Sequence, residues 1–166
     1  MSPDVDELQI EGETPIELVV RLAETKARAI ASSHPGSLII GSDQVAITDD
    51  EVLTKPGSHE NARNQLKKIN HKSIIFLTGL CVLNTTHNRT QKDCVRYTVH
   101  FRDLTDDEIE RYLHKETPYD CVGSFKSEGY GISLVQRMEG EDPTSLVGLP
   151  LILLTEMLRN ENLNIP

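Results

Sequence analysis

The stretch LIIGSDQV, residues 38–45, places a carboxylate shortly after a run of apolar residues. Residues 38–40 follow the turn-forming pair Pro35-Gly36 and predict a short buried strand. A carboxylate at the end of such a strand is costly unless a cation or hydrogen bonds meet it, and in open α/β sheets ligands bind at the carboxyl ends of strands. Asp43 is therefore the first candidate for chemistry, with an Asx-type turn that ends the strand as the alternative.

Size and charge limit the kinds of protein that this chain can be. It has 166 residues, of which 37% are hydrophobic and 26% charged, which predicts one globular domain with a real core. The formal net charge of -9 argues against nonspecific nucleic-acid binding, because that needs a basic surface. An acidic protein can still bind a phosphorylated small molecule where a few lysines or arginines gather in one cleft.

The cysteines and the hydropathy pattern indicate the cellular compartment in which the protein is expected. Cys81, Cys94 and Cys121 are far apart and form no CxxC or Cys/His ligand spacing, so their pattern argues against a zinc site. Three thiols without a disulfide framework suit a reducing cytoplasm. No apolar stretch is long enough to span a bilayer and no signal-peptide pattern opens the chain, so we expect a cytoplasmic protein with no membrane partner.

Residues 14–17, TPIE, predict a helix start, with a threonine cap, a proline at the first position and a glutamate that completes a capping box. Lys26 falls at the edge of the apolar stripe of this helix, which is expected to end near Ser33. Its ammonium either extends to water or points into the same cleft as Asp43. The apolar residues at helical spacing are Ile16, Val19, Val20, Ala23, Ala27 and Ile30.

A chain reversal is predicted after the Asp43 stretch. Residues 48–51 have turn composition, and residues 52–53 return as a second extended segment, which indicates a hairpin. This hairpin would carry Lys55 back toward Asp43. Residues 58–69 then predict a helix that is capped by a serine.

The middle of the chain is rich in predicted strands. Residues 73–83 and 90–101 predict an antiparallel pair that is joined by a polar turn. A second capping box at residues 105–108 opens a short helix through Leu113. A final helix begins near Pro150, and its predicted core face is Leu151, Leu154, Met157 and Leu158.

Two loops carry further candidate residues. Residues 121–131, CVGSFKSEGYG, contain three glycines that let the backbone approach a ligand, with Lys126 and Glu128 among them. Asp6 and Glu7 lie in an acidic N-terminal loop, which is either solvated or reaches a metal in a cleft. The residues thus predict an α/β domain in which lysines and carboxylates converge, as hydrolysis of a nucleotide polyphosphate requires.

Four motifs, LIIGSDQV, TKP, GSFKSEGYGI and LVGLPL, occur in this order along the chain. Together they resemble the Maf family of nucleoside triphosphate pyrophosphatases, and the resemblance runs from the segment Val5-Asp6-Glu7 to the last helix. It implies an elongated, two-lobed α/β domain with a mixed central sheet and a cleft. It also implies cleavage of a nucleotide between its α and β phosphates with a divalent cation, Mg or Mn.

Roles follow from this resemblance at individual positions. Asp43 matches the catalytic acidic residue, which would act as a general base and contact the metal. Lys26 and Lys55 match the lysines that hold phosphate charge, and Glu7 matches a metal ligand. The expected partner is a nucleoside triphosphate, and the sequence leaves a homodimer open.

Two positions sort the branches of the family. The branch that acts on dTTP and UTP carries threonine and glutamine where this chain has Gln44 and Glu128. The pair is similar to the branch that prefers 7-methyl-GTP. A glutamate can accept two hydrogen bonds from the N1 and N2 edge of guanine, and it favours the positive charge of an N7-methylated base.

One departure from the family concerns the phosphate-binding loop. The family's S-x-S-P-x-R-R loop has no counterpart in this sequence. We therefore expect a single Maf-like domain over residues 1–166 that is incomplete at its N-terminus, with an unpaired sheet edge and impaired activity. The alternative function is a nucleotide-binding or cell-division regulatory protein without catalysis.

Overall fold

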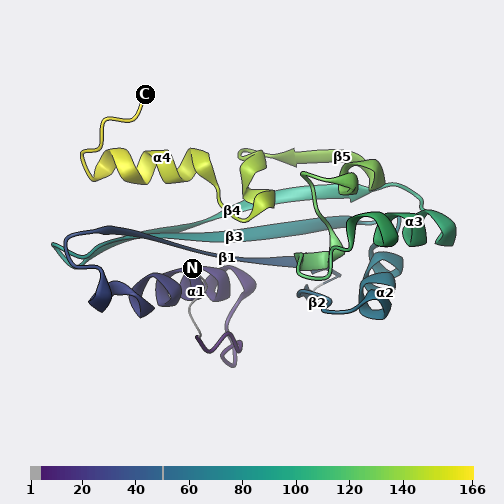
Figure 1. Cartoon of the computed structure of the whole chain (residues 1–166), viewed down its shortest axis with the longest axis horizontal. Helices are drawn as coiled ribbons and strands as arrows, with labels where there is room; N and C mark the ends of the chain where they lie inside the picture. The colour runs from purple at the N-terminus through teal and green to yellow at the C-terminus, as the bar shows by residue number, and fades with distance from the viewer. Residues whose placement is uncertain (1–4, 50) are drawn as a thin grey trace.

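The computed structural model describes residues 5–49 and 51–166 as an elongated α/β domain (Figure 1). Its five-stranded sheet has the order β2-β1-β3-β4-β5. The helices are α1 (Pro15–Ala29), α2 (His59–Ile69), α3 (Asp106–Glu116) and α4 (Leu151–Asn160). The strands are β1 (Leu38–Thr48), β2 (Glu51–Leu53), β3 (Ser73–Asn84), β4 (Arg89–Phe101) and β5 (Val135–Gly140). The predicted α/β class is thus confirmed.

The starts of α1, α2 and α3 were predicted correctly, because each depends on a local side-chain cap. In α1, Thr14 Oγ1 accepts a hydrogen bond from the Glu17 amide at 3.3 Å, and Glu17 Oε2 accepts one from the Thr14 amide at 2.8 Å. The same reciprocal pair joins Thr105 and Glu108 at α3. Prediction of the buried faces was less accurate, since Ile16 is 52% exposed in the first turn of α1. Leu151, the first residue of α4, is also exposed.

All strand pairings among the described residues are antiparallel, so the expected mixed sheet is not found there. A parallel neighbour needs a crossover connection between opposite ends of the sheet. Here the chain leaves and re-enters at one end, because Ile47 near the end of β1 pairs with Ile75 near the start of β3. The predicted hairpin between β1 and β2 is confirmed, with Thr48 opposite Glu51.

Asp43 lies in the middle of a strand, which corrects the prediction that it follows the end of one. β1 is 11 residues long, and Asp43 pairs with Gly79 of β3. The Asx-turn alternative is therefore wrong as well. β2 pairs only with residues 46–48, so residues 38–45 have a strand partner on the β3 side alone among the described residues. Asp43 thus lies along an open edge of the sheet.

Two glycines allow α1 to lie unusually close to β1 and β3. A Cβ atom on Gly41 would lie 2.1 Å from the Ala23 carbonyl oxygen, and one on Gly79 would lie 2.2 Å from the Val19 carbonyl oxygen. Real Cβ atoms do not come so near to backbone atoms, so only glycine fits at these positions. Gly41 lies within β1 at the point where α1 contacts the strand.

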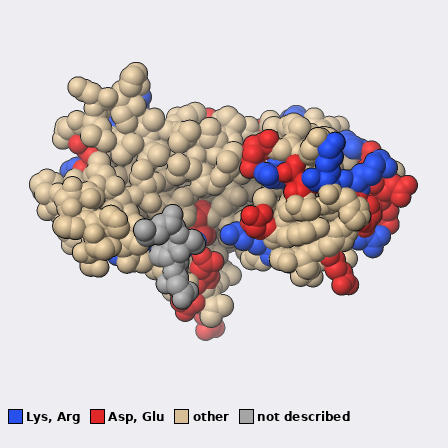
Figure 2. Space-filling model, in the orientation of Figure 1, with Lys and Arg blue, Asp and Glu red and all other residues tan. Residues whose placement is uncertain are grey.

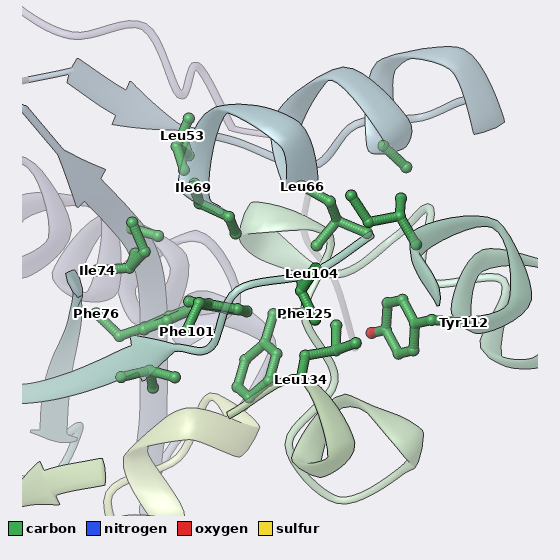
Figure 3. Close-up of a cluster of buried hydrophobic side chains, with 14 of the residues drawn as sticks. Leu53, Leu66, Ile69, Ile74, Phe76, Phe101, Leu104, Tyr112, Phe125 and Leu134 are labelled. Atoms are coloured by element: carbon green, nitrogen blue, oxygen red, sulfur yellow. The ribbon is translucent and has the colours of Figure 1, made fainter. Parts of the chain in front are cut away.

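The apolar core is divided between the two halves of the molecule. Toward one end, α1 and α4 cover opposite faces of the sheet, and toward the other end α2 and α3 pack beside it (Figure 1). In that second half, the Phe125 ring lies 5.8 Å from Phe76 and 5.3 Å from Phe101, measured between centroids, within a larger cluster that includes Leu66 (Figure 3). Phe125 therefore anchors the glycine-containing loop in the core.

No helix in the described part of the chain is long and apolar enough to cross a membrane. Cys81, Cys94 and Cys121 are free thiols, in agreement with the absence of a disulfide framework in the sequence pattern. Burial raises the pKa of each thiol to about 11, so all three are protonated near neutral pH.

Candidate active site

A cleft of about 660 Å³ lies where the N-terminal segment, α1, β1 and two loops meet. It brings together residues that are far apart in the sequence. Its lining includes Glu7, Lys26, Asp43, Gln44, Lys55, Lys126, Glu128 and residues 146–148. Of the candidate residues from the sequence, Asp6 alone is absent from this lining.

Lys26 connects two carboxylates in this cleft. Its Nζ atom lies 2.6 Å from Asp43 Oδ1 and 2.6 Å from Glu7 Oε1. Asp43 is the more buried of the acids, with its side chain 11% exposed against 60% for Glu7. Of the two alternatives for Lys26, the structure shows the one in which its ammonium points to Asp43.

The surroundings of Asp43 favour proton uptake. Burial raises the pKa of the Asp43 carboxyl above its ordinary value, and the Lys26 ammonium opposes that rise. Burial also lowers the pKa of Lys26, but hydrogen bonds to Asp43 and Glu7 outweigh this effect, and the pKa is raised overall. A carboxylate with a raised pKa is a stronger base, and the cation keeps it oriented.

Lys55 reaches the same cleft from the segment after β2. Its side chain is exposed, and its positive charge is close enough to act against the raised pKa of Asp43. The hairpin therefore carries Lys55 toward Asp43, as the sequence predicted.

Gln44 points to the opposite face of the sheet from Asp43, because side chains alternate along a strand. Its Nε2 atom donates to Thr78 Oγ1 at 3.0 Å and to the Ser145 carbonyl oxygen at 2.7 Å. The carbonyl can only accept, which fixes the orientation of the amide. Ser42 Oγ lies 2.7 Å from the Gly148 carbonyl oxygen, so β1 holds the 145–148 segment at two points.

Glu128 lines the cleft from a loop that is anchored by its neighbours. The Tyr112 hydroxyl donates to the Ser124 carbonyl and accepts from the Lys126 amide, both at 3.1 Å. The Lys126 ammonium is engaged by Glu116 at 2.8 Å. Glu128 itself is exposed, so its carboxylate is accessible from the cleft.

A divalent cation in this cleft would draw on Glu7 and Asp43. Both carboxylates present an oxygen to the same point in the cleft, where the Lys26 ammonium lies 2.6 Å from each. Two carboxylates leave the remaining positions to water and phosphate oxygens, as Mg²⁺ prefers. A second group of side chains that could hold a metal ion, His59, Glu110 and His114, does not line this cleft.

Comparison with known proteins adds to this geometry. The profile of the family described as Maf-like protein matches residues 1–161. The chain belongs to the Maf family. A Maf relative from Pseudomonas fluorescens strain Pf0-1, named 7-methyl-GTP pyrophosphatase, is 56% identical over 165 residues, which cover 99% of this chain and 86% of the relative. A relative of the same name from Alcanivorax borkumensis strain SK2 is 53% identical, with 99% and 84% covered.

Some residues that shape this Maf cleft escaped the sequence analysis. The strand contacts of Ser42 and the packing of Gly41 and Gly79 against α1 were not predicted, because they involve residues distant in sequence. A period of two through residues 38–45 could have assigned Asp43 and Gln44 to opposite faces. The polar residues in the middle of this segment interrupt its apolar pattern, so the full length of the strand was not predicted.

Proposed function

We propose that this Maf protein is a hydrolase of acid anhydrides that cleaves 7-methyl-GTP to 7-methyl-GMP and pyrophosphate. The observation that carries the proposal is the partly buried Asp43, whose carboxylate Lys26 holds at 2.6 Å in the cleft. More than 50% identity to proteins named 7-methyl-GTP pyrophosphatase supports the choice of substrate. The activity would remove an unwanted nucleotide from the cytoplasmic pool, and the three free thiols fit that compartment.

Asp43 acts as the general base in this mechanism. It takes a proton from the attacking water, whose oxygen bonds to the α-phosphorus as the bond to the bridging oxygen breaks and pyrophosphate leaves. Lys26 and Lys55 offset the phosphate charge and hold the reacting groups in line. Substrate competes with Asp43 and Glu7 for the Lys26 ammonium, so phosphate binding loosens the ion pair and frees the base.

Glu7 and Asp43 would hold a divalent cation, Mg or Mn, together with phosphate oxygens. Bound there, the cation would neutralise charge that develops on the phosphate oxygens. The protein residues perform the remaining tasks of orienting the nucleotide and accepting the proton.

Glu128 is the residue we assign to base recognition. Its exposed carboxylate can accept from the guanine N1 and N2 groups and attract the positive charge of the methylated ring. Gln44 contributes to specificity by a different route, because both of its amide hydrogens are used to hold the 145–148 wall of the cleft.

The decisive experiment separates hydrolysis from binding. The full chain is incubated with 7-methyl-GTP and Mg²⁺ or Mn²⁺, and pyrophosphate and 7-methyl-GMP are quantified by chromatography, with GTP, dTTP and UTP as competing substrates. Equimolar products that form with wild type and disappear in Asp43→Asn support the proposal. Tight binding of 7-methyl-GTP with no product would instead identify a nucleotide-binding protein without this activity.

A further inference from the structure

We propose that His59, Glu110 and His114 form a binding site for a divalent transition metal of the Zn²⁺ type. One ligand atom from each of these three side chains lies within 4.8 Å of the other two. The site lies between α2 and α3 and does not depend on the nucleotide cleft. The half of the molecule that carries these helices is rich in mixed charges (Figure 2).

The three side chains converge because of their positions on the helices. His59 is the first residue of α2, and Glu110 and His114 are four residues apart on one face of α3. Glu110 Oε2 lies 2.9 Å from His59 Nε2 and 3.7 Å from His114 Nε2. The centroids of the two imidazole rings are 5.1 Å apart. Small rotations of the side chains bring all three donors around one ion.

Neighbouring groups already orient two of the ligands, as the outer contacts of metal sites do. His59 Nδ1 lies 2.9 Å from the Tyr119 hydroxyl, which can accept the Nδ1 proton and leave the Nε2 lone pair for a metal. Arg63 Nε lies 2.6 Å from Glu110 Oε1, so the other carboxylate oxygen faces the imidazoles.

The donor set selects the kind of metal. Two imidazole nitrogens and one carboxylate oxygen suit Zn²⁺, Ni²⁺ or Cu²⁺, whereas Mg²⁺ and Ca²⁺ prefer oxygen ligands. His114 is 75% exposed, which leaves an entry path and a fourth position for water. Arg63 also lies 3.4 Å from Asp106. The negative charge of Asp106 offsets part of the repulsion that Arg63 would exert on a bound metal ion.

Metal bound here would link α2 to α3 near the loop that lines the cleft. The Gly57 amide donates to the Tyr119 carbonyl at 2.9 Å, and residues 120–128 follow directly. An ion that binds the folded state alone stabilises it by mass action. No sequence motif indicates this site, because His59 and Glu110 are 51 residues apart along the chain.

The test uses the untagged full chain after removal of metal with a chelator. Calorimetric titration with ZnCl₂ is expected to give one site per chain, and Co²⁺ is expected to produce the visible absorption of a site with nitrogen ligands. Zn²⁺ should raise the melting temperature of wild type. His114→Gln should weaken Zn²⁺ binding at least about 10-fold. Loss of a residue that only supports a ligand already lowers metal affinity by about that factor, and loss of the ligand itself should lower it no less.

Matched controls separate this site from other histidines and from the cleft. His34→Gln and His87→Gln change exposed histidines elsewhere and should leave Zn²⁺ affinity unchanged, as should Glu7→Gln in the cleft. Melting of the metal-free variants checks that each still folds. The proposal is overturned if wild type binds no stoichiometric Zn²⁺, or if His114→Gln and His59→Gln both bind it as tightly as wild type.

Discussion

Lys26 Nζ and Asp43 Oδ1 lie 2.6 Å apart across the interface between α1 and β1. The contact depends on how closely the helix approaches the strand, which Gly41 and Gly79 permit. An ion pair that is mostly shielded from water holds the carboxylate in place, while burial still raises its pKa. The contact with Lys26 therefore fixes the position of Asp43, while burial, against the effect of that contact, raises its basicity.

Asp43→Asn is expected to lower kcat for 7-methyl-GTP by roughly 10²- to 10⁴-fold, the usual cost of losing a general base. The melting temperature of the variant should not fall at neutral pH. A raised pKa means that the ionised Asp43 carboxylate is less favourable in the folded state than in the unfolded state, so its removal does not destabilise the fold. Steady-state kinetics and thermal melts check both parts. Asp49→Asn, which changes an exposed acid beyond the end of β1, is the control, and wild-type turnover in Asp43→Asn would refute the assignment.

Gly79→Ala is expected to destabilise the fold by about 1–3 kcal/mol, the usual cost of overpacking a core. The new Cβ atom would meet the Val19 carbonyl oxygen at 2.2 Å, so α1 must move away from the sheet. That movement separates Lys26 from Asp43, and kcat/KM should fall as well. Urea unfolding and kinetics measure the two effects, and an unchanged unfolding midpoint would show that the helix adjusts without cost.

The sequence predicted the helices and hairpins well because caps, turns and apolar periods are local signals. Thr14, Ser58 and Thr105 each cap the start of a helix, as expected. The pairing of β1 with β3 and the exposure of Ile16 depend on distant packing, which no local pattern contains. For the site, family motifs selected residues that do share one cleft, but the supporting contacts of Gln44 and Phe125 required the structure.

Gln44→Glu is expected to loosen the wall of the cleft. A carboxylate cannot donate to the Ser145 carbonyl oxygen, which Gln44 Nε2 now reaches at 2.7 Å, so this oxygen keeps only the hydrogen bond from Thr78 Oγ1 at 3.0 Å and faces a negative charge. The loss of one hydrogen bond costs about 1 kcal/mol. KM for 7-methyl-GTP should rise more than kcat falls, because the wall positions substrate while Asp43 is untouched. Gln9→Glu, which changes an exposed glutamine at the cleft rim, is the comparison. A loss in kcat alone would contradict this positioning role.

The stability of α3 should depend on pH through Glu108. Hydrogen bonds from Arg102 and from the Thr105 amide lower the pKa of Glu108 to about 2, below its ordinary value of 4.5. A depressed carboxyl pKa stabilises the fold above the unfolded-state pKa, and this stabilisation is lost as pH falls toward 2. Glu108→Gln should therefore lower the unfolding midpoint more at pH 7 than at pH 3. Equal losses at both values would exclude an ionic origin.

Glu128→Gln tests how the base is selected. The carboxylate offers two acceptor oxygens and a negative charge to a methylated guanine, whereas the amide offers one acceptor and no charge. Hydrogen bonds to charged groups exceed neutral ones by about 1 kcal/mol, so preference for 7-methyl-GTP over GTP should fall by roughly 5-fold in kcat/KM. Glu60→Gln, an exposed change in the first turn of α2, should leave that ratio unaltered. Because Asp43, Lys26 and Lys55 remain, turnover of GTP should persist in the variant. An unchanged ratio would mean that another part of the cleft recognises the methylated base.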